Sequence, residues 1–202
     1  AEHVKDFYGG DLWGIAEKLD YLKDLGVNLI YTTPIFLSPS NHKYDTVDYM
    51  RIDSQFGGER AFKYYLKKGK ENGFRVMLDG VFNHLSKENE WFKKALRGDK
   101  THMSKFTFYK NGYRSWNNFE GMPEWNWEEL EVRNYLLSVV EHYLRLGIDG
   151  WRLDVGFDVG YVNNALINSR AKSVSTEKYV VTETWNFPSN WTVVDGIMNY
   201  HF

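Results

Sequence analysis

The chain contains no cysteine, only four prolines and no long apolar run among its 202 residues. The absence of cysteine excludes disulfide bonds and thiolate chemistry, but it does not fix the compartment, so cytoplasmic and secreted locations both stay open. Without a window of about eighteen apolar residues, no helix can span a membrane. The net charge of −2 also lacks the basic excess that nucleic acids and anionic membranes attract. We therefore expect a globular protein with neither nucleic acid nor membrane as a partner.

Aromatic residues are unusually frequent and make up 17% of the chain. One reading of this excess is a hydrophobic core rich in rings. The other is that several rings line a cleft for flat, hydroxylated rings such as sugars, which present apolar C–H faces. Composition alone leaves both readings open.

An amphipathic helix, a glycine and an apolar strand follow one another repeatedly along the chain. The apolar stripe from Leu12 to Leu25 predicts a helix that ends before Gly26, and residues 27–36 read as a buried strand. The same unit predicts helices over 59–72 and 126–146, and strands over 74–82, 148–155, 178–185 and 195–202. This alternation predicts a parallel sheet with right-handed crossovers. A doubly wound sheet and a (β/α)8 barrel both fit, although no glycine-rich phosphate loop follows any strand.

The longest segment between a strand and a helix runs from about residue 84 to residue 126. It is rich in Lys, Asn, Gly and aromatic residues, so it predicts a small inserted subdomain rather than disorder. Asn83, Asn89, Asp99 and Asn117 are oxygen ligands that calcium accepts, but their spacing has no EF-hand pattern. Calcium is therefore compatible with the sequence, and no set of metal ligands is predicted.

Acidic residues close three consecutive predicted strands, at Asp79, Asp154 and Glu183. Arg152 lies two residues before Asp154, and side chains alternate along a strand, so both point to the same face. Any one of these acids could be structural, as when an Asp caps a turn. Because all three fall at carboxyl ends, where barrel enzymes hold their active sites, we favour a functional cluster.

Two chemistries fit such a cluster. Carboxylates on successive strands can hold a divalent metal ion, as in the enolase superfamily, but Arg152 would compete with the metal. Glycoside chemistry instead needs one ionised and one protonated carboxyl group. Arg152 is predicted to lower the pKa of Asp154. The apolar neighbours of Glu183 are predicted to raise its pKa; they are Val180, Val181, Trp185 and Phe187. Asp154 is then the nucleophile, and Glu183 is the proton donor.

Several motifs resemble signature regions of the alpha-amylase family, glycoside hydrolase family 13. They are "DGVFNH" at 79–84, "GWRLDV" at 150–155 and "ETW" at 183–185, preceded by "SPSNHKYDTVDYMRID". The resemblance covers nearly the whole chain in the right order. It implies that residues 1–202 form part of a catalytic (β/α)8 TIM barrel, with about strands 2–6 present. The predicted subdomain at 84–126 then lies between strand 3 and helix 3.

The resemblance also implies a role for each acid of the cluster. Asp154 forms a covalent glycosyl-enzyme intermediate, Glu183 acts as general acid and then general base, and Arg152 orients and ionises Asp154. The implied activity is retaining hydrolysis or transglycosylation of alpha-1,4-glucans. No cofactor is required for this chemistry.

Five further residues are implied to bind or support the substrate. His84 hydrogen-bonds the sugar beside the scissile bond, and Tyr44 stacks on that same ring. Asp79 and Asn83 support the site, and Trp185 lies near the leaving-group side.

Within the family, "NHKYDT" is similar to the neopullulanase, cyclomaltodextrinase and maltogenic amylase group. This likeness implies maltooligosaccharides, cyclodextrins, pullulan or starch as substrates, and it allows a homodimer, since members of the group often dimerise. The group typically carries "MPKLN" before a helix, whereas this chain has "MPEWN", with Glu124 and Trp125 at the two changed positions. The subgroup and the preferred glucan are therefore left open.

One departure from the family is larger. The third catalytic carboxylate of the family is an Asp in an "NHD"-like motif after strand 7, and the sequence contains no such motif. The first strand of the family is missing as well, so we expect the chain to be a portion of a longer enzyme. The missing acid also motivates an alternative hypothesis, a catalytically silent glucan-binding module with an amylase-like fold.

We predict that the 202-residue chain alone does not hydrolyse glucans, because a five-strand piece leaves two open sheet edges and lacks the third carboxylate. The purified chain is incubated with maltoheptaose, and short products are measured by chromatography. Turnover above that of a mock purification, with contaminating amylase excluded, contradicts this prediction.

Overall fold

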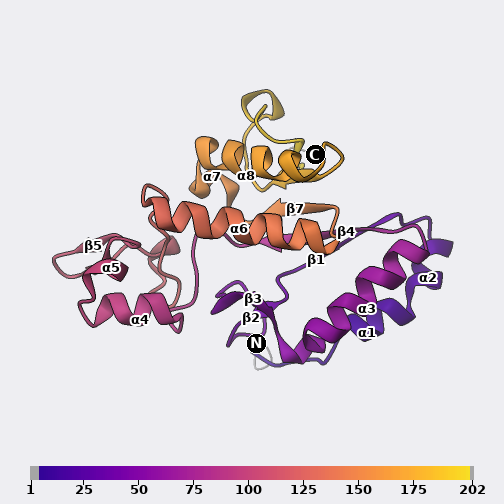
Figure 1. Cartoon of the computed structure of the whole chain (residues 1–202), viewed down its shortest axis with the longest axis horizontal. Helices are drawn as coiled ribbons and strands as arrows, with labels where there is room; N and C mark the ends of the chain where they lie inside the picture. The colour runs from indigo at the N-terminus through magenta and orange to yellow at the C-terminus, as the bar shows by residue number, and fades with distance from the viewer. Residues whose placement is uncertain (1–4, 201–202) are drawn as a thin grey trace.

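The computed structural model of the chain describes residues 5–200 and is built around one five-stranded parallel sheet (Figure 1). The strands lie in the order β1 (Leu29–Thr32), β4 (Arg75–Gly80), β7 (Gly150–Leu153), β8 (Tyr179–Thr182) and β9 (Gly196–Ile197). All neighbouring pairs are parallel, so the carboxyl ends of the strands meet at one edge. The predicted parallel sheet is confirmed.

The main helices are α3 (Gly58–Glu71), α6 (Leu130–Leu146) and α8 (Tyr161–Val174), with the short α7 (Gly156–Val159) directly after β7. Strand β7 is buried along its whole length. Trp151 of β7 contacts the rings of Phe36, Phe82 and Tyr143, and its indole Nε1 donates to the carbonyl of Val140 on α6 at 3.3 Å. The side of β7 that carries Trp151 is therefore the apolar side, and Arg152 lies on the other.

The predicted element boundaries differ from the structure at several places. Strands β4, β7 and β8 are each shorter than predicted, and β9 ends at Ile197, whereas the last two residues of its predicted range lie outside the described residues. The helix predicted over 12–25 is two helices, α1 (Leu12–Glu17) and α2 (Leu19–Asp24), separated by Lys18 in a non-helical conformation. The strand predicted over 27–36 stops at Thr32, shortly before Pro34, which lacks the backbone N–H that a ladder needs. The helix predicted from residue 126 begins at residue 130.

Residues beyond Pro34 form a separate antiparallel hairpin rather than the end of β1. Strand β2 (Phe36–Leu37) pairs with β3 (Asp48–Ile52), and the 3₁₀ helix η1 (Ser54–Phe56) follows. The hairpin loop, residues 38–47, carries Tyr44. The aromatic ring of Phe36 joins the core around Trp151, so the hairpin is anchored on the apolar side of the sheet.

The segment predicted as an insertion contains α4 (Glu90–Leu96), α5 (Lys100–Met103), the hairpin of β5 (Phe108–Tyr109) and β6 (Gly112–Tyr113), and the 3₁₀ helix η2 (Trp116–Asn118). In Figure 1, α4, α5 and β5 lie together at one end of the molecule. An isolated bridge between His84 and Glu124 closes the segment at its base. Phe106 and Trp125 stack at 5.1 Å and belong to the same core as the sheet. That residues 84–126 form a subdomain stays a prediction.

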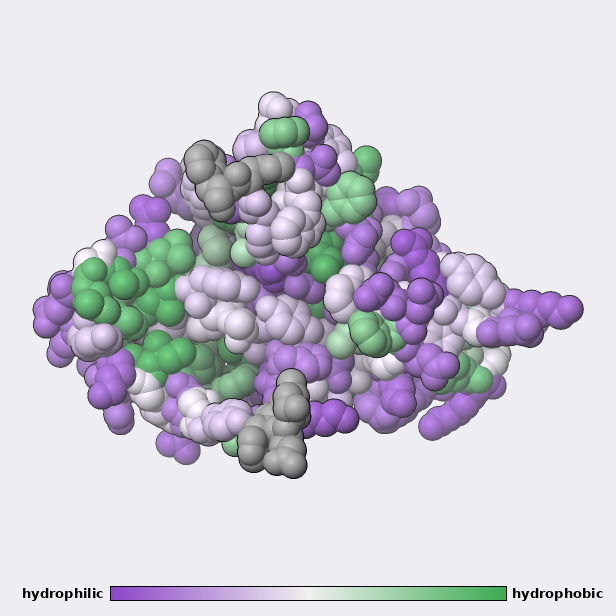
Figure 2. All heavy atoms as spheres, turned by 180° about the vertical axis from the view of Figure 1, so that it is seen from behind, coloured by the Kyte–Doolittle hydropathy of each residue, from purple (hydrophilic) through white to green (hydrophobic). Residues whose placement is uncertain are grey.

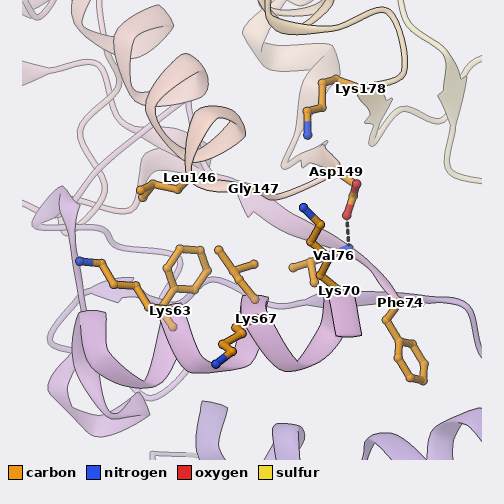
Figure 3. A pocket seen from close by; sticks show the side chains of 11 residues that line it. Lys63, Lys67, Lys70, Phe74, Val76, Leu146, Gly147, Asp149 and Lys178 are labelled. Atoms are coloured by element: carbon orange, nitrogen blue, oxygen red, sulfur yellow. Dashed lines mark hydrogen bonds between the residues drawn. The ribbon is translucent and has the colours of Figure 1, made fainter. Parts of the chain in front are cut away.

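Two cavities border the helices α1, α2 and α3. One, of about 540 Å³, lies between α3 and the end of α6, near the amino ends of β4 and β7 (Figure 3). There Asp149 accepts a hydrogen bond from the backbone N–H of Val76 at 2.8 Å. The side chain of Lys67 points away from Asp149. The other, of about 380 Å³, adjoins the hydrophobic area over α1 and α2 in Figure 2. Neither is lined by a residue of the predicted site.

Gly150 lets β7 and β8 approach closely, because a Cβ at this position would lie 2.4 Å from the carbonyl oxygen of Tyr179. We predict that Gly150→Ala lowers the free energy of unfolding by about 1–3 kcal/mol through this clash. Urea unfolding of the protein that carries the chain measures the effect. Gly121→Ala is the control, since a Cβ there meets no atom within 4 Å. Equal urea midpoints for the two variants would contradict the prediction.

Candidate active site

Arg152 binds three carboxylates at the carboxyl edge of the sheet. Its Nη1 lies 2.9 Å from Asp79 Oδ1 and 2.9 Å from Asp154 Oδ1, and its Nη2 lies 2.7 Å from Glu183 Oε2. Register explains this convergence, because Asp79 and Arg152 are direct partners between β4 and β7. The backbone N–H of Glu183 donates to Leu153 at 2.9 Å, which continues the ladder between β7 and β8 to the site.

Asp79 lies deepest in the cluster and is 1% exposed. Besides Arg152, it accepts hydrogen bonds from the hydroxyl groups of Tyr44, at 3.1 Å, and Tyr31. Burial raises the pKa of Asp79, although Arg152 and the two hydroxyl groups oppose this shift. Tyr31 was missed at the level of the sequence. It lies on β1 beside β4, and its only signal was a place on the same face of the sheet as Asp79.

The pKa of Asp154 is raised to about 7, chiefly by burial and then by the negative charge of Asp79, against the lowering effect of Arg152. The prediction that Arg152 holds this pKa below its ordinary value is therefore wrong in its net direction. The same guanidinium group also binds Asp79 and Glu183, and the negative charges of these two carboxylates raise the pKa of Asp154. Burial of the carboxyl group and these two charges together outweigh the effect of Arg152.

Glu183 has more polar surroundings than the sequence predicted. Its Oε2 accepts from the backbone N–H of Val155 at 2.9 Å, and its Oε1 accepts from the Tyr200 hydroxyl at 2.9 Å. Trp185 stacks on Tyr200 with ring centroids 4.0 Å apart, yet Trp185 is 70% exposed, and Phe187 is exposed as well. Of the predicted apolar neighbours, Trp185 and Phe187 therefore do not bury the carboxyl group.

Val155 directly follows Asp154 and has a φ of +40°. A β-branched residue rarely adopts this left-handed conformation, which costs about 1–3 kcal/mol unless the surroundings hold it in place. Here the conformation aims the backbone N–H at Glu183. The hydrogen bond from this strained turn thus links the segment after Asp154 to Glu183, which follows the next strand, β8.

His84 is 1% exposed and stacks on Trp116 of η2, with ring centroids 5.3 Å apart. Burial lowers the pKa of His84 to about 4, against a smaller opposing effect of the Tyr44 backbone, so the imidazole is neutral at pH 7. Asn83 is also buried, and its Nδ2 lies 3.4 Å from His84 Nδ1. Trp116 is a second residue that sequence reasoning missed, because nothing in the insertion's pattern ties it to His84.

A cavity of about 390 Å³ opens over the cluster, within the usual size range of ligand pockets. Its lining comes from the hairpin loop, the insertion and the ends of β7 and β8: His42, Tyr44, His84, Trp116, Met122, Arg152, Asp154, Val155 and Glu183. Asp79, Asn83 and Trp185 are not part of this lining. The cavity therefore presents two carboxyl groups and a set of rings to one small volume.

Two of the four residues considered for calcium use their side-chain oxygens to cap helices. Asn89 Oδ1 caps α4 by accepting from the backbone of Trp91 and Phe92, and Asp99 caps α5. Between residues 5 and 200, no group of three or more His, Asp or Glu side chains is arranged to hold a metal ion. Within the same residues, no helix is long and apolar enough to cross a bilayer.

Comparison with known proteins gives consistent matches. A family model described as "Alpha amylase, catalytic domain" matches residues 2–199. The chain is 42% identical to the intracellular maltogenic amylase of Bacillus subtilis, over 98% of this chain and 36% of that protein. It is 39% identical to a cyclomaltodextrinase of Geobacillus thermopakistaniensis, over 96% of this chain and 35% of that protein. The chain thus spans about a third of the length of these relatives.

Solved structures agree with the sequence matches. A cyclic alpha-maltosyl-(1→6)-maltose hydrolase from Arthrobacter globiformis superposes with a TM-score of 0.93 at 33% identity, covering 97% of this chain and 48% of that chain. A debranching enzyme from Nostoc punctiforme gives a TM-score of 0.90 at 39% identity, covering 96% and 44%. The parallel sheet is accordingly part of a (β/α)8 barrel, and the chain belongs to the alpha-amylase family, glycoside hydrolase family 13.

Proposed function

We propose that this chain carries the nucleophile and the general acid of a retaining enzyme that acts on alpha-1,4-glucans. The observation that supports this proposal best is the joint position of Asp154 and Glu183. They follow neighbouring strands, bind the same guanidinium group and line one cavity together with Tyr44 and His84. The names of the relatives, maltogenic amylase and cyclomaltodextrinase among them, support an alpha-glucan as the substrate.

In the first step, an Asp154 oxygen attacks the anomeric carbon and forms a glycosyl ester while the glycosidic C–O bond breaks. Arg152 Nη1 holds Oδ1 of Asp154 at 2.9 Å, which fixes the direction of attack. The attacking group must be ionised. Because the pKa of Asp154 is about 7, a large fraction of the carboxyl group is an anion at neutral pH.

Glu183 supplies the proton that the leaving oxygen needs. Its Oε2 is held by Arg152 and the Val155 N–H, whereas Oε1 meets the Tyr200 hydroxyl. A hydroxyl group can both donate and accept, so Oε1 can gain and lose a proton without breaking the bonds of Oε2. In the second step Glu183 takes a proton from water, which hydrolyses the ester. Attack by a sugar hydroxyl instead gives transglycosylation.

Incubation of the protein that carries this chain with maltoheptaose or β-cyclodextrin tests the proposed activity. Release of short maltooligosaccharides supports it. Binding of either glucan without any product, measured by calorimetry, would instead favour the silent glucan-binding module.

We predict that Asp154→Asn abolishes turnover, because an amide cannot form the glycosyl ester. The expected loss of kcat is at least about 10³-fold, within the range that electrostatic and covalent catalysis supply. Circular dichroism and thermal unfolding verify that the variant is folded. Activity within about tenfold of the parent rules out the assigned role of Asp154.

We also predict an acid limb in the pH profile of kcat/KM with a midpoint near pH 7. The pKa of Asp154 is raised to about 7, so below this pH most of the carboxyl group is protonated and cannot attack. Asp79→Asn removes a negative charge that raises this pKa, and the limb should then move to lower pH. A parent enzyme whose limb lies at pH 5 or below contradicts the prediction.

A further inference from the structure

Lys43 is a buried lysine that directly precedes Tyr44 in the loop between β2 and β3. Its side chain is 2% exposed, and it does not line the cavity above the carboxylates. The Nζ atom donates to the Ser38 carbonyl at 2.9 Å, to Asp53 Oδ2 at 2.7 Å and to Gln55 Oε1 at 2.5 Å. All three protons of the ammonium group are thereby used.

These partners lie at the two ends of the hairpin loop. Ser38 follows β2, whereas Asp53 and Gln55 follow β3. Asp53 also accepts from the backbone N–H groups of Ser38, at 3.3 Å, and Gln55, at 2.9 Å. The ammonium group lies 5.8 Å from the ring centroid of Phe56, which adds a cation–π contact. The buried ammonium group of Lys43 therefore links the two ends of the loop that carries Tyr44.

The backbone of the loop takes an unusual conformation at Lys43. Lys43 has a φ of +66°, a left-handed conformation that a long side chain adopts only where its surroundings fix it. Its N–H donates to Ser40 Oγ at 3.0 Å, and the N–H of Tyr44 donates to His42 Nδ1 at 3.0 Å. This turn sends the Lys43 side chain to the base of the hairpin, and it lets the next side chain reach Asp79, where the Tyr44 hydroxyl donates at 3.1 Å.

We propose that Lys43 is a positioning residue, which acts on the reaction through Tyr44 by clamping the loop so that the Tyr44 ring lies beside Asp79 and over the cavity. This inference rests on the proposed function. Lys43 touches neither the carboxylates that react nor the cavity, so its effect on catalysis passes through Tyr44.

A double-mutant cycle in the protein that carries the chain tests this proposal. Lys43→Met alone should lower kcat/KM for an activated aryl maltoside about 10- to 100-fold, the scale of a misplacement of about 1 Å in an active site. In a Tyr44→Ala background the same substitution should change kcat/KM by less than about twofold, because the two residues act in one chain of contacts. If Lys43→Met lowers kcat/KM by the same factor in the Tyr44→Ala background as in the parent, the proposal is wrong.

A matched control separates positioning from general stability. Lys105 is as buried as Lys43 and lies over the ring of Trp91 at 5.2 Å. Its ammonium group binds the Thr101 carbonyl and Glu131, neither of which belongs to the hairpin loop. Lys105→Met should lower the melting temperature but leave kcat/KM within about twofold of the parent below its melting transition. A loss of kcat/KM equal to that of Lys43→Met overturns the proposal. If Lys43→Met does not fold, Asp53→Asn replaces it in the cycle.

A crystal structure distinguishes failure of this inference from failure of the proposed function. If the parent protein shows no turnover, the proposed function fails, but the position of Tyr44 can still be measured in the Lys43→Met variant. Loss of the 3.1 Å hydrogen bond between the Tyr44 hydroxyl and Asp79 supports the positioning role. An unchanged Tyr44 overturns it.

Discussion

Every charged group of the site depends on a single guanidinium group that is almost completely buried. The Arg152 side chain is 8% exposed and has Asp79, Asp154 and Glu183 around it. Removal of one partner from a buried ion pair costs about 3–5 kcal/mol, and here the loss of Arg152 would leave three acids close together without a counter-charge. The sheet register cannot shift to avoid this, because a shift by one residue would turn Arg152 toward the apolar side that Trp151 occupies.

The same arrangement affects the pKa values of the acids. A cluster with one cation and three carboxylates cannot stabilise every negative charge, so at least one acid keeps its proton more readily than it would in water. Asp154 is one such acid, since burial and Asp79 raise its pKa more than Arg152 lowers it. A nucleophile that is only partly stabilised as an anion keeps more of its reactivity. The cost is a loss of folding stability that builds up as the pH rises from 3.8 to about 7, because the folded protein must then hold the extra charge.

Much of the fold follows from local pattern, and much of the site does not. The period of apolar residues predicts the parallel strands, and the alternation along residues 150–155 is enough to place Arg152 and Asp154 on one face. The break at Lys18 has no glycine or proline to mark it, and the hairpin after Pro34 depends on contacts with the distant Trp151. The direction of the Asp154 pKa depends on how many carboxylates surround one Arg, which only the three-dimensional arrangement gives. Tyr200 and Trp116 reach the site from distant segments whose local sequence carries no signal for it.

The rings that border the cavity are carried on segments outside the parallel sheet. Tyr44 comes from the separate hairpin and Trp116 from the insertion. In contrast, Arg152 lies within β7, and the three acids of the cluster lie in strands of the parallel sheet or directly after them. Ladder hydrogen bonds constrain the strands, but loops tolerate insertion, deletion and exchange. Divergence within such a family can therefore alter the length and composition of the border while the bond-breaking groups keep their geometry. The relatives carry different names, from maltogenic amylase to debranching enzyme. Such variety is expected where the loops that border a site change and the reacting groups do not.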